Sequence, residues 1–271
     1  MIIRGMPNAE YHKRPEMSQS RLKRIAKTPA YFKAHEDGLI KQSETASMTL
    51  GTQVHCATLE ATRFWESYYL QPTFENSAQS KAGKLEREDV AAANPGKEPL
   101  TAAENAQIWG MAASVRSHPA AEYLLSGDDT EVSVFGMLED VPCRCRPDAL
   151  LEVEGGYIIV DLKTTTDASK DGFGKSIANF GYDVQAAWYS DVCTAAGMNI
   201  HAFAFVAVES SIPYLTATYM LTGEDRMSGR EQYKDLLQTY KQCVETGIWP
   251  GYSDAVEIIE LPGWYKHKRS R

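Results

Sequence analysis

Residues 146–163 read RPDALLEVEGGYIIVDLK, and this stretch decides the fold. Its apolar runs predict two β-strands, over about Val141–Val153 and Tyr157–Thr164. Glu154-Gly155-Gly156 between them is typical of a tight hairpin turn. The sequence therefore predicts a hairpin whose second strand ends in charged residues, which a buried strand does not carry without a reason.

Three charged side chains are expected to meet at the end of this hairpin. Side chains alternate between the two faces of a strand, so Asp161 and Lys163 lie on one face, roughly 6.5–7 Å apart. Asp148, on the neighbouring strand, is expected opposite them. Carboxylate oxygens of this kind hold Mg²⁺, and a nearby lysine orients water or stabilises negative charge. The structural alternative is an ion pair at the surface.

The spacing of these residues resembles a known signature. Pro147-Asp148, twelve residues, and then Asp161-Leu162-Lys163 is similar to the PD-(D/E)xK nuclease pattern. A predicted helix with Gly51-x-x-x-His55 precedes it, and one with Gln185-x-x-x-Tyr189 follows it. This ordered set resembles the RecB-like branch, and within it the phage and prophage exonuclease VIII (RecE-type) exodeoxyribonucleases. The opening stretch 11–32 adds to the resemblance, which covers roughly residues 10 to 250.

The resemblance implies an α/β fold of the restriction-endonuclease type, with a mixed central sheet flanked by helices. We expect one nuclease domain over residues 1–271. A mainly helical N-terminal part over 1–125 packs on the catalytic sheet and helices of 126–262. A basic tail over 263–271 ends the chain.

The resemblance also implies roles for individual residues. Mg²⁺, or Mn²⁺ as a substitute, is expected to be held by His55, Asp148, Asp161 and the Leu162 carbonyl. Lys163 would activate water, and Gln185 and Tyr189 would place the substrate at the metal. The structural alternatives are a core histidine for His55 and a surface hydrogen-bond pair for Gln185 and Tyr189.

Further residues are candidates for DNA contact. Arg144 and Arg146 share the parity of Asp148, so we expect them near the phosphates of the cleaved strand. Thr164 and Thr165 follow Lys163 and are candidates for phosphate binding. Glu131 is an accessory metal-site carboxylate or an ordinary glutamate at a strand end. Basic residues also gather on two N-terminal helices, where they form either a phosphate-binding surface or a solvated face: Arg21, Lys23, Arg24, Lys27 and Lys33.

The implied activity is ATP-independent 5′→3′ digestion of linear double-stranded DNA in phage-type homologous recombination. The implied partners are double-stranded DNA ends, a single-strand annealing protein and copies of the chain in a ring-shaped homotetramer. We find no P-loop motif, in agreement with ATP independence. An endonuclease on the same fold and a non-catalytic DNA-binding recombination subunit stay open as alternatives.

Composition indicates an ordinary globular protein of 271 residues that carries a net charge of −8. No apolar run is long enough for a membrane span or a signal peptide, and the five cysteines are odd in number. We therefore expect reduced thiols and a cytoplasmic location in a bacterial host that carries the phage or prophage. Cys143-x-Cys145 and three scattered cysteines do not match the four spaced cysteines of an iron–sulfur cluster, so none is expected.

Periodicity and capping signals predict the remaining elements. Helices are expected over 19–26, 29–35, 45–60, 85–93, 101–117, 119–125, 183–196 and 223–245. Further strands are expected over 130–138, 201–209, 214–221 and 255–261. Residues 167–181, which contain two glycines near Phe173, are expected to form a loop.

Overall fold

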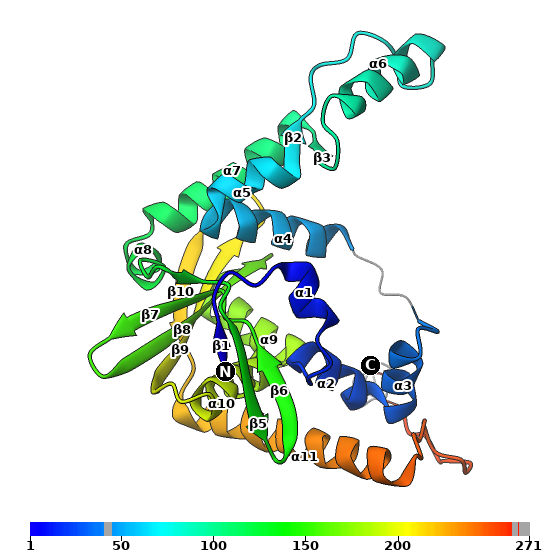
Figure 1. Ribbon diagram of the computed structural model, residues 1–271, viewed down its shortest axis with the longest axis vertical. Helices are drawn as coiled ribbons and strands as arrows, with labels where there is room; N and C mark the ends of the chain where they lie inside the picture. The colour runs from blue at the N-terminus through cyan, green and yellow to red at the C-terminus, as the bar shows by residue number, and fades with distance from the viewer. Residues whose placement is uncertain (41–44, 262–264, 266–271) are drawn as a thin grey trace.

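The computed structural model describes residues 1–40, 45–261 and 265, which form a mixed α/β fold (Figure 1). A five-stranded sheet with the order β10-β9-β8-β7-β4 lies at its centre. In chain order its strands are β4 (Asp129–Thr130), β7 (Ala149–Val153), β8 (Gly156–Thr165), β9 (Ile200–Glu209) and β10 (Thr216–Met220). The predicted mixed central sheet is confirmed.

Strand β8 is the middle strand of this sheet. It pairs antiparallel with β7 and parallel with β9. Gly155 closes the β7–β8 hairpin with a φ of 77°, a left-handed conformation that glycine adopts without steric cost. The parallel β8–β9 pair needs a long crossover, and two helices supply it: α9 (Lys170–Phe180) and α10 (Tyr182–Ala195).

A second, antiparallel sheet of three strands packs beside the first, in the order β1-β5-β6. Its strands are β1 (Ile2–Ile3), β5 (Ser133–Leu138) and β6 (Val141–Cys145). The chain passes from the central sheet to this one after β4 and returns to the central sheet before β7. Glu131 and Asp148 lie at these two crossings.

Two predictions of continuous strands, over 130–138 and 141–153, are wrong for this reason. Each stretch forms two strands that belong to different sheets. Glu131 breaks the first with a φ of 52°, outside the extended region. Pro147 lies at the second break, where a residue without a backbone N–H cannot donate to a sheet ladder.

Helices cover both faces of the central sheet. One face packs on α2 (Gln19–Lys27), α10 and α11 (Gly223–Thr246), and the other on α4 (Ala46–Leu59), α5 (Ala61–Ser67), α7 (Ala102–Ser117) and α8 (Pro119–Leu124). Strand alternation separates the two cores, because Ile159 lies in the first and Val160 in the second. By the same alternation Asp161 and Lys163 face α10.

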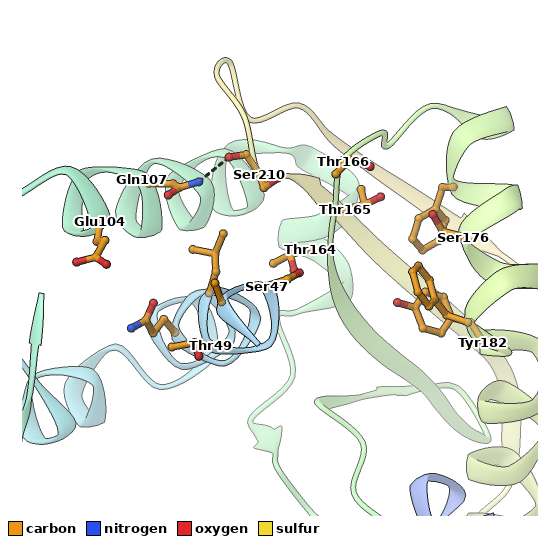
Figure 2. Close-up of a pocket in the computed structure, with 15 residues that line it drawn as sticks. Ser47, Thr49, Glu104, Gln107, Thr164, Thr165, Thr166, Ser176, Tyr182 and Ser210 are labelled. Atoms are coloured by element: carbon orange, nitrogen blue, oxygen red, sulfur yellow. Dashed lines mark hydrogen bonds between the residues drawn. The ribbon is translucent and has the colours of Figure 1, made fainter. Parts of the chain in front are cut away.

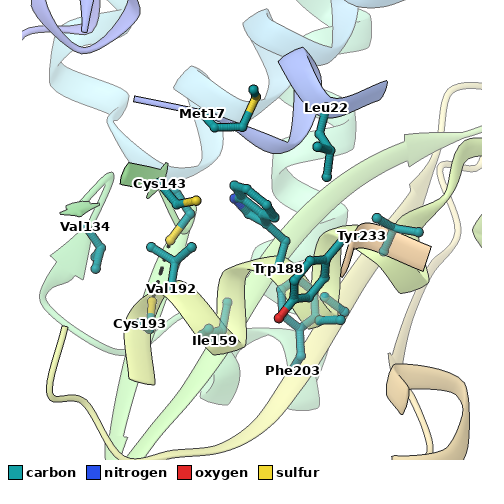
Figure 3. Close-up of a cluster of buried hydrophobic side chains, with 14 of the residues drawn as sticks. Met17, Leu22, Val134, Cys143, Ile159, Trp188, Val192, Cys193, Phe203 and Tyr233 are labelled. Carbon is teal, nitrogen blue, oxygen red and sulfur yellow. Dashed lines mark hydrogen bonds between the residues drawn. The ribbon is translucent and has the colours of Figure 1, made fainter. Parts of the chain in front are cut away.

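The core on the α10 side is built around Trp188 (Figure 3). Its ring meets the Tyr233 ring of α11 edge-on, with centroids 5.4 Å apart. Its indole nitrogen donates to the Arg144 carbonyl at 3.0 Å, which ties α10 to β6. The sulfur atoms of Cys145 and Cys193 lie 3.7 Å apart in this core, and all five cysteines are free.

Capping signals placed the helix ends well. Ser18 accepts from the Arg21 amide at the start of α2, and Thr101 and Glu104 form a capping box at the start of α7. Gly247 ends α11 with a φ of 71°. Short helices α1 (Asn8–Lys13) and α3 (Pro29–Glu36) complete the N-terminal part.

Two further predictions are wrong. Residues 167–181 are not a loop, because Ser169 caps helix α9 by accepting from the Gly172 amide. Residues 255–261 form no strand, and the apolar side chains Val256, Ile258 and Ile259 are exposed. The segment has β-strand propensity, but it pairs with no strand among the described residues.

An arm projects from the body at the top of Figure 1. The parallel strands β2 (Tyr68–Leu70) and β3 (Glu98–Leu100) form its base, and α6 (Lys81–Ala92) lies beyond them. The helix is longer than predicted, and the two strands were not predicted. The Arg87 guanidinium carbon lies 4.1 Å from the centroid of the Phe74 ring. The outer part of the arm is therefore stabilised by contacts among its own residues.

The assignment of residues 1–271 to one nuclease domain, with parts over 1–125 and 126–262, stays a prediction. The basic tail 263–271 lies outside the described residues, apart from Tyr265. In the described parts of the chain no helix combines the length and the apolar character that a membrane span needs.

Candidate active site

Two carboxylates lie where the chain changes sheets. Glu131 follows β4 and Asp148 precedes β7, and the two crossings lie side by side because the Glu131 amide donates to the Asp148 carbonyl at 3.1 Å. The left-handed backbone of Glu131, with a φ of 52°, is uncommon for a residue with a side chain. Such strain is frequent at functional sites.

His55 on α4 bridges these two carboxylates. Its Nε2 lies 3.1 Å from Asp148 Oδ1, and its Nδ1 lies 3.4 Å from Glu131 Oε1. Each of the three residues offers one ligand atom, and these atoms lie within 4.8 Å of one another. The helical part and the sheet therefore both contribute to one cluster.

A second group of charges lies on the α10 side of β8. Asp161 is 1% exposed, accepts a 2.6 Å hydrogen bond from Gln185 Nε2 at Oδ1, and forms an ion pair with Lys163 through Oδ2. Lys163 Nζ also lies 4.9 Å from the centroid of the Tyr182 ring. The predicted same-face arrangement of Asp161 and Lys163 is present in the structure.

Asp148 connects the two groups. Its Oδ2 accepts a 2.7 Å hydrogen bond from the Leu162 amide, between Asp161 and Lys163 on β8. The five predicted charged and amide side chains, His55, Asp148, Asp161, Lys163 and Gln185, are thus brought together. Among the described residues, however, Asp161 is outside the cluster that could hold a metal, and Glu131 is inside it.

Burial and charge shift the pKa values of this site. Burial raises the pKa of Glu131 to about 7 and that of Asp161 to about 6. For His55, burial opposes protonation, but the Asp148 and Glu131 carboxylates outweigh it and raise the pKa to about 9. Burial opposes ionisation of Asp148, but the charge and hydrogen bond of His55 hold its pKa below the usual value.

These donors fit a divalent cation. An imidazole nitrogen and two carboxylate oxygens that converge from three segments are ligands that Mn²⁺ and Mg²⁺ accept. The protonated histidine between two carboxylates places one positive charge where a metal cation would lie. A metal there would replace that proton, and Asp161 and the Leu162 carbonyl are the other predicted ligands.

The cluster opens into a cavity of about 990 Å³. His55, Glu131, Asp148 and Lys163 lie on its wall, together with Arg146. A polynucleotide strand can therefore reach the charged residues from solvent.

The two predicted DNA-binding arginines are engaged inside the protein. Arg146 donates to the Met6 carbonyl at 2.5 Å and to Ser133 Oγ at 2.9 Å, and Arg144 donates to the Tyr11 carbonyl. Both guanidinium groups also lie over the Tyr11 ring. Both side chains are buried, and through these contacts they attach the N-terminal segment that contains Met6 and Tyr11 to the end of β6. Contact with DNA stays a prediction for them.

The other predicted substrate residues lie around the site. Tyr189 lines a small cavity with Arg144 and Glu131, one helical turn beyond Gln185 on α10. Thr164 and Thr165 line a large cavity beside the metal site, and Thr165 Oγ1 donates to the Asp167 carbonyl at 3.2 Å. Their contact with substrate stays a prediction.

The basic helix residues divide into two groups. Arg21 and Arg24 pair with Glu36, Lys33 pairs with Asp37, and Lys27 lies over the Tyr31 ring. Lys23 instead lies within electrostatic range of Lys163 and Asp161. Contact of any of the five residues with phosphate stays a prediction.

The sequence left open whether Glu131 is an accessory ligand or an ordinary glutamate, and it indicated no role for Tyr11. In the structure Glu131 belongs to the cluster that could hold a metal. A single glutamate at the end of a predicted strand has no local signal that distinguishes a ligand from a solvated residue. Tyr11 belongs to the opening stretch of the family resemblance, but its contact with two arginines is set by tertiary structure.

Comparisons with known proteins agree with the geometry. A crystal structure from Eubacterium rectale, described as a candidate exonuclease, superposes with a TM-score of 0.64 at 16% identity and covers 95% of each chain. At this identity the likeness shows a shared fold. A crystal structure described as SSO0001 aligns with a TM-score of 0.30 at 14% identity, over 87% of this chain and 96% of that chain. This TM-score is too low to indicate a shared fold. No curated protein matches the sequence.

The family profile described as a PDDEXK-like domain of unknown function (DUF3799) matches residues 18–262. The matched range holds His55, Glu131, Asp148, Asp161, Lys163 and Gln185. Because the match covers most of the chain, the protein belongs to this PDDEXK-like family of the PD-(D/E)xK nuclease superfamily.

Proposed function

We propose that this protein is a metal-dependent exodeoxyribonuclease that digests linear double-stranded DNA. One observation carries the proposal: the buried Asp161–Lys163 pair adjoins the His55–Glu131–Asp148 donor cluster on the wall of an open cavity. A structural ion pair has no need of a second carboxylate–imidazole cluster beside it. Phosphodiester hydrolysis needs both a metal site and a positioned cation.

The residues of the chain would divide the work as follows. A bound Mg²⁺ or Mn²⁺ supplies a hydroxide near neutral pH and offsets charge on the phosphate. Lys163 orients the attacking water or stabilises the developing negative charge. Gln185 fixes the Asp161 carboxylate through its 2.6 Å hydrogen bond, so that the Lys163 ammonium group stays in place.

A small cavity favours an exonuclease over an endonuclease. It measures about 210 Å³ and adjoins Glu131, and its wall includes Gln19, Arg144 and two serines, Ser18 and Ser20. Gln19 Nε2 and Arg144 Nε are buried there without a hydrogen-bond acceptor among the described residues. Buried donors of this kind fit the terminal phosphate of a strand, which only a DNA end presents.

The finer features belong to the same proposal. They are 5′→3′ polarity, ATP independence, a ring-shaped homotetramer, a single-strand annealing partner and a recombination role in the cytoplasm of a bacterium that carries the phage or prophage. The resemblance to RecE-type exonucleases supports them, while the description of the Eubacterium rectale protein as a candidate exonuclease supports exonuclease activity alone. A ring would keep a subunit of net charge −8 on DNA by enclosure.

The test uses a linear duplex labelled at either the 5′ or the 3′ end and a covalently closed circle, each with Mg²⁺ or with chelator. We expect metal-dependent release of the 5′ label as mononucleotides, with circles intact. Lys163→Ala should be inactive, while Lys33→Ala, with its exposed Asp37 partner, should match the wild type. Cleavage of circles would favour an endonuclease. Binding without cleavage in Mg²⁺ and Mn²⁺ would favour a non-catalytic subunit.

A further inference from the structure

A second cavity of about 750 Å³ lies directly beside the metal site (Figure 2). Four residues line both cavities and form the boundary between them: Ser47, Thr164, Phe180 and Tyr182. Figure 2 shows Thr164 and Tyr182 facing this space from β8 and from the start of α10. A group bound at Lys163 is therefore one residue along β8 from the second cavity.

The lining of the second cavity differs in charge from that of the first. Among the described residues that line it, Glu104 is the only charged one, and its carboxylate is engaged by the Thr101 amide and hydroxyl, each at 2.8 Å. The metal cavity, by contrast, is lined by Arg63, Arg146 and Lys163. The described wall of the second cavity thus offers a phosphate no cationic side chain and consists mainly of amides, hydroxyls and aromatic rings.

An amide on this wall lacks a partner. Gln53 of α4 is 8% exposed, lines the cavity and makes no hydrogen bond to any described residue. Its amide atoms are not among the fully buried atoms that lack a partner, so they reach the cavity and can bind a ligand or water there. Its adjacent donor and acceptor match the edge of a nucleobase, as glutamine does when it binds adenine.

An exposed aromatic ring lies at the boundary. Phe180, the last residue of α9, is 56% exposed although it lines both cavities, and its ring centroid lies 5.7 Å from that of Tyr182. Aromatic side chains that bind single-stranded nucleic acid stack on bases in this way, independently of base identity.

We propose that the second cavity binds a nucleobase, namely the base of the nucleotide that adjoins the phosphate held at Lys163. Phe180 stacks on this base and Gln53 pairs with its edge. The proposal rests on the proposed nuclease function and deepens it, because it requires the base next to the cleaved bond to leave the duplex before cleavage. Base identity is not selected, since a stack and one amide accept every base.

The inference can be tested by removing the nucleobase from the DNA substrate, which leaves the protein unchanged. Linear duplexes carry a tetrahydrofuran abasic nucleotide at one of the three terminal positions of the degraded strand. Wild-type protein should cleave one of these positions on the order of 5- to 150-fold more slowly than the natural duplex, which corresponds to the loss of one base stack. Phe180→Ala should be slowed on natural DNA, and its further loss on the abasic substrate should be smaller than that of the wild type, because only the contact with Gln53 is left to lose.

Two controls keep the result specific. Tyr123→Ala, which removes a 60% exposed ring on α8 outside both cavities, should behave as the wild type, and Phe180→Tyr should keep the base effect. The inference is overturned if wild-type protein cleaves all abasic ends at the natural rate, or if Phe180→Ala keeps the full abasic effect.

A binding measurement separates this inference from the nuclease proposal. With Ca²⁺ in place of Mg²⁺, fluorescence anisotropy gives the affinity for natural and abasic ends without cleavage. The wild type should prefer natural ends, and Phe180→Ala should show a clearly smaller preference. A preference without digestion in Mg²⁺ would reject the nuclease proposal and leave the base site standing. Digestion of natural and abasic ends with equal affinities and equal rates would reject the base site and leave the nuclease proposal standing.

Discussion

Replacing His55 by glutamine should destabilise the metal-free protein at pH 6 but not near pH 9. The pKa of His55 rises from 6.5 to about 9 on folding, against burial, because of Asp148 and Glu131. A histidine whose pKa is raised on folding stabilises the fold fully below pH 6.5, and the contribution is lost as the pH rises through 9. At about 1.36 kcal/mol per unit, this shift sets an upper limit of about 3.4 kcal/mol. The side chain is 22% exposed to an open cavity, so screening leaves roughly 1–2 kcal/mol.

The measurement is urea denaturation of both proteins in chelator, at pH 6, 7, 8 and 9. The difference in free energy of unfolding between wild type and His55→Gln should fall steadily over this range. In thermal unfolding it should correspond to roughly 3–6 °C at pH 6. His201→Gln is the matched control, because His201 follows the start of β9, at the opposite end of the β8–β9 pair from Lys163.

Mn²⁺ should reverse the pH dependence of the wild type. A metal binds neutral imidazole and ionised carboxylates, so its binding displaces the His55 proton and strengthens as the pH rises. Isothermal titration in buffers of different ionisation enthalpy should therefore detect proton release at pH 7. A difference between wild type and His55→Gln that stays constant from pH 6 to 9 would show that folding leaves the pKa of His55 unchanged, and the reasoning would fail.

Three shorter predictions concern other parts of the molecule. Gln185→Leu removes the donor at Asp161 Oδ1, so kcat should fall on the order of 10- to 100-fold while DNA affinity in Ca²⁺ stays the same. Gly229→Ala should lower the free energy of unfolding by about 1–3 kcal/mol in urea, because a Cβ there would lie 2.4 Å from the Asp183 carbonyl oxygen. Lys23→Ala should reduce the slope of log affinity against log salt concentration by about 1, as expected for one lost phosphate contact.

Local signals in the sequence were enough to locate the core of the site. Asp161 and Lys163 lie two positions apart on a strand, so their shared face follows from strand geometry alone. The helix that holds Gln185 was predicted from the sequence, while a role for Gln185 was implied by the family resemblance, and its hydrogen bond to Asp161 follows from the β8–α10 packing. These features depend on contacts within one β-strand–helix unit.

Features that depend on distant contacts were missed. The strand breaks at Glu131 and Pro147 exist because the chain changes sheets there, and the apolar alternation continues through both breaks. Helix α9 was missed because two glycines argue against a helix. The structure gives a reason for one of them, since a Cβ on Gly172 would lie 2.1 Å from the Asp167 carboxylate.

The assembly of the site from separate segments links metal binding to folding. His55 comes from a helix on one side of the central sheet, Glu131 and Asp148 come from two crossings between sheets, and Lys163 comes from β8. Without metal, the protonated His55 holds the two carboxylates together at neutral pH. A metal bound there would replace that proton and hold the same segments, so it should stabilise the docking of α4 on the sheet. Because Gln53 lies on the same helix, half a turn before His55, metal binding should also order the wall of the second cavity.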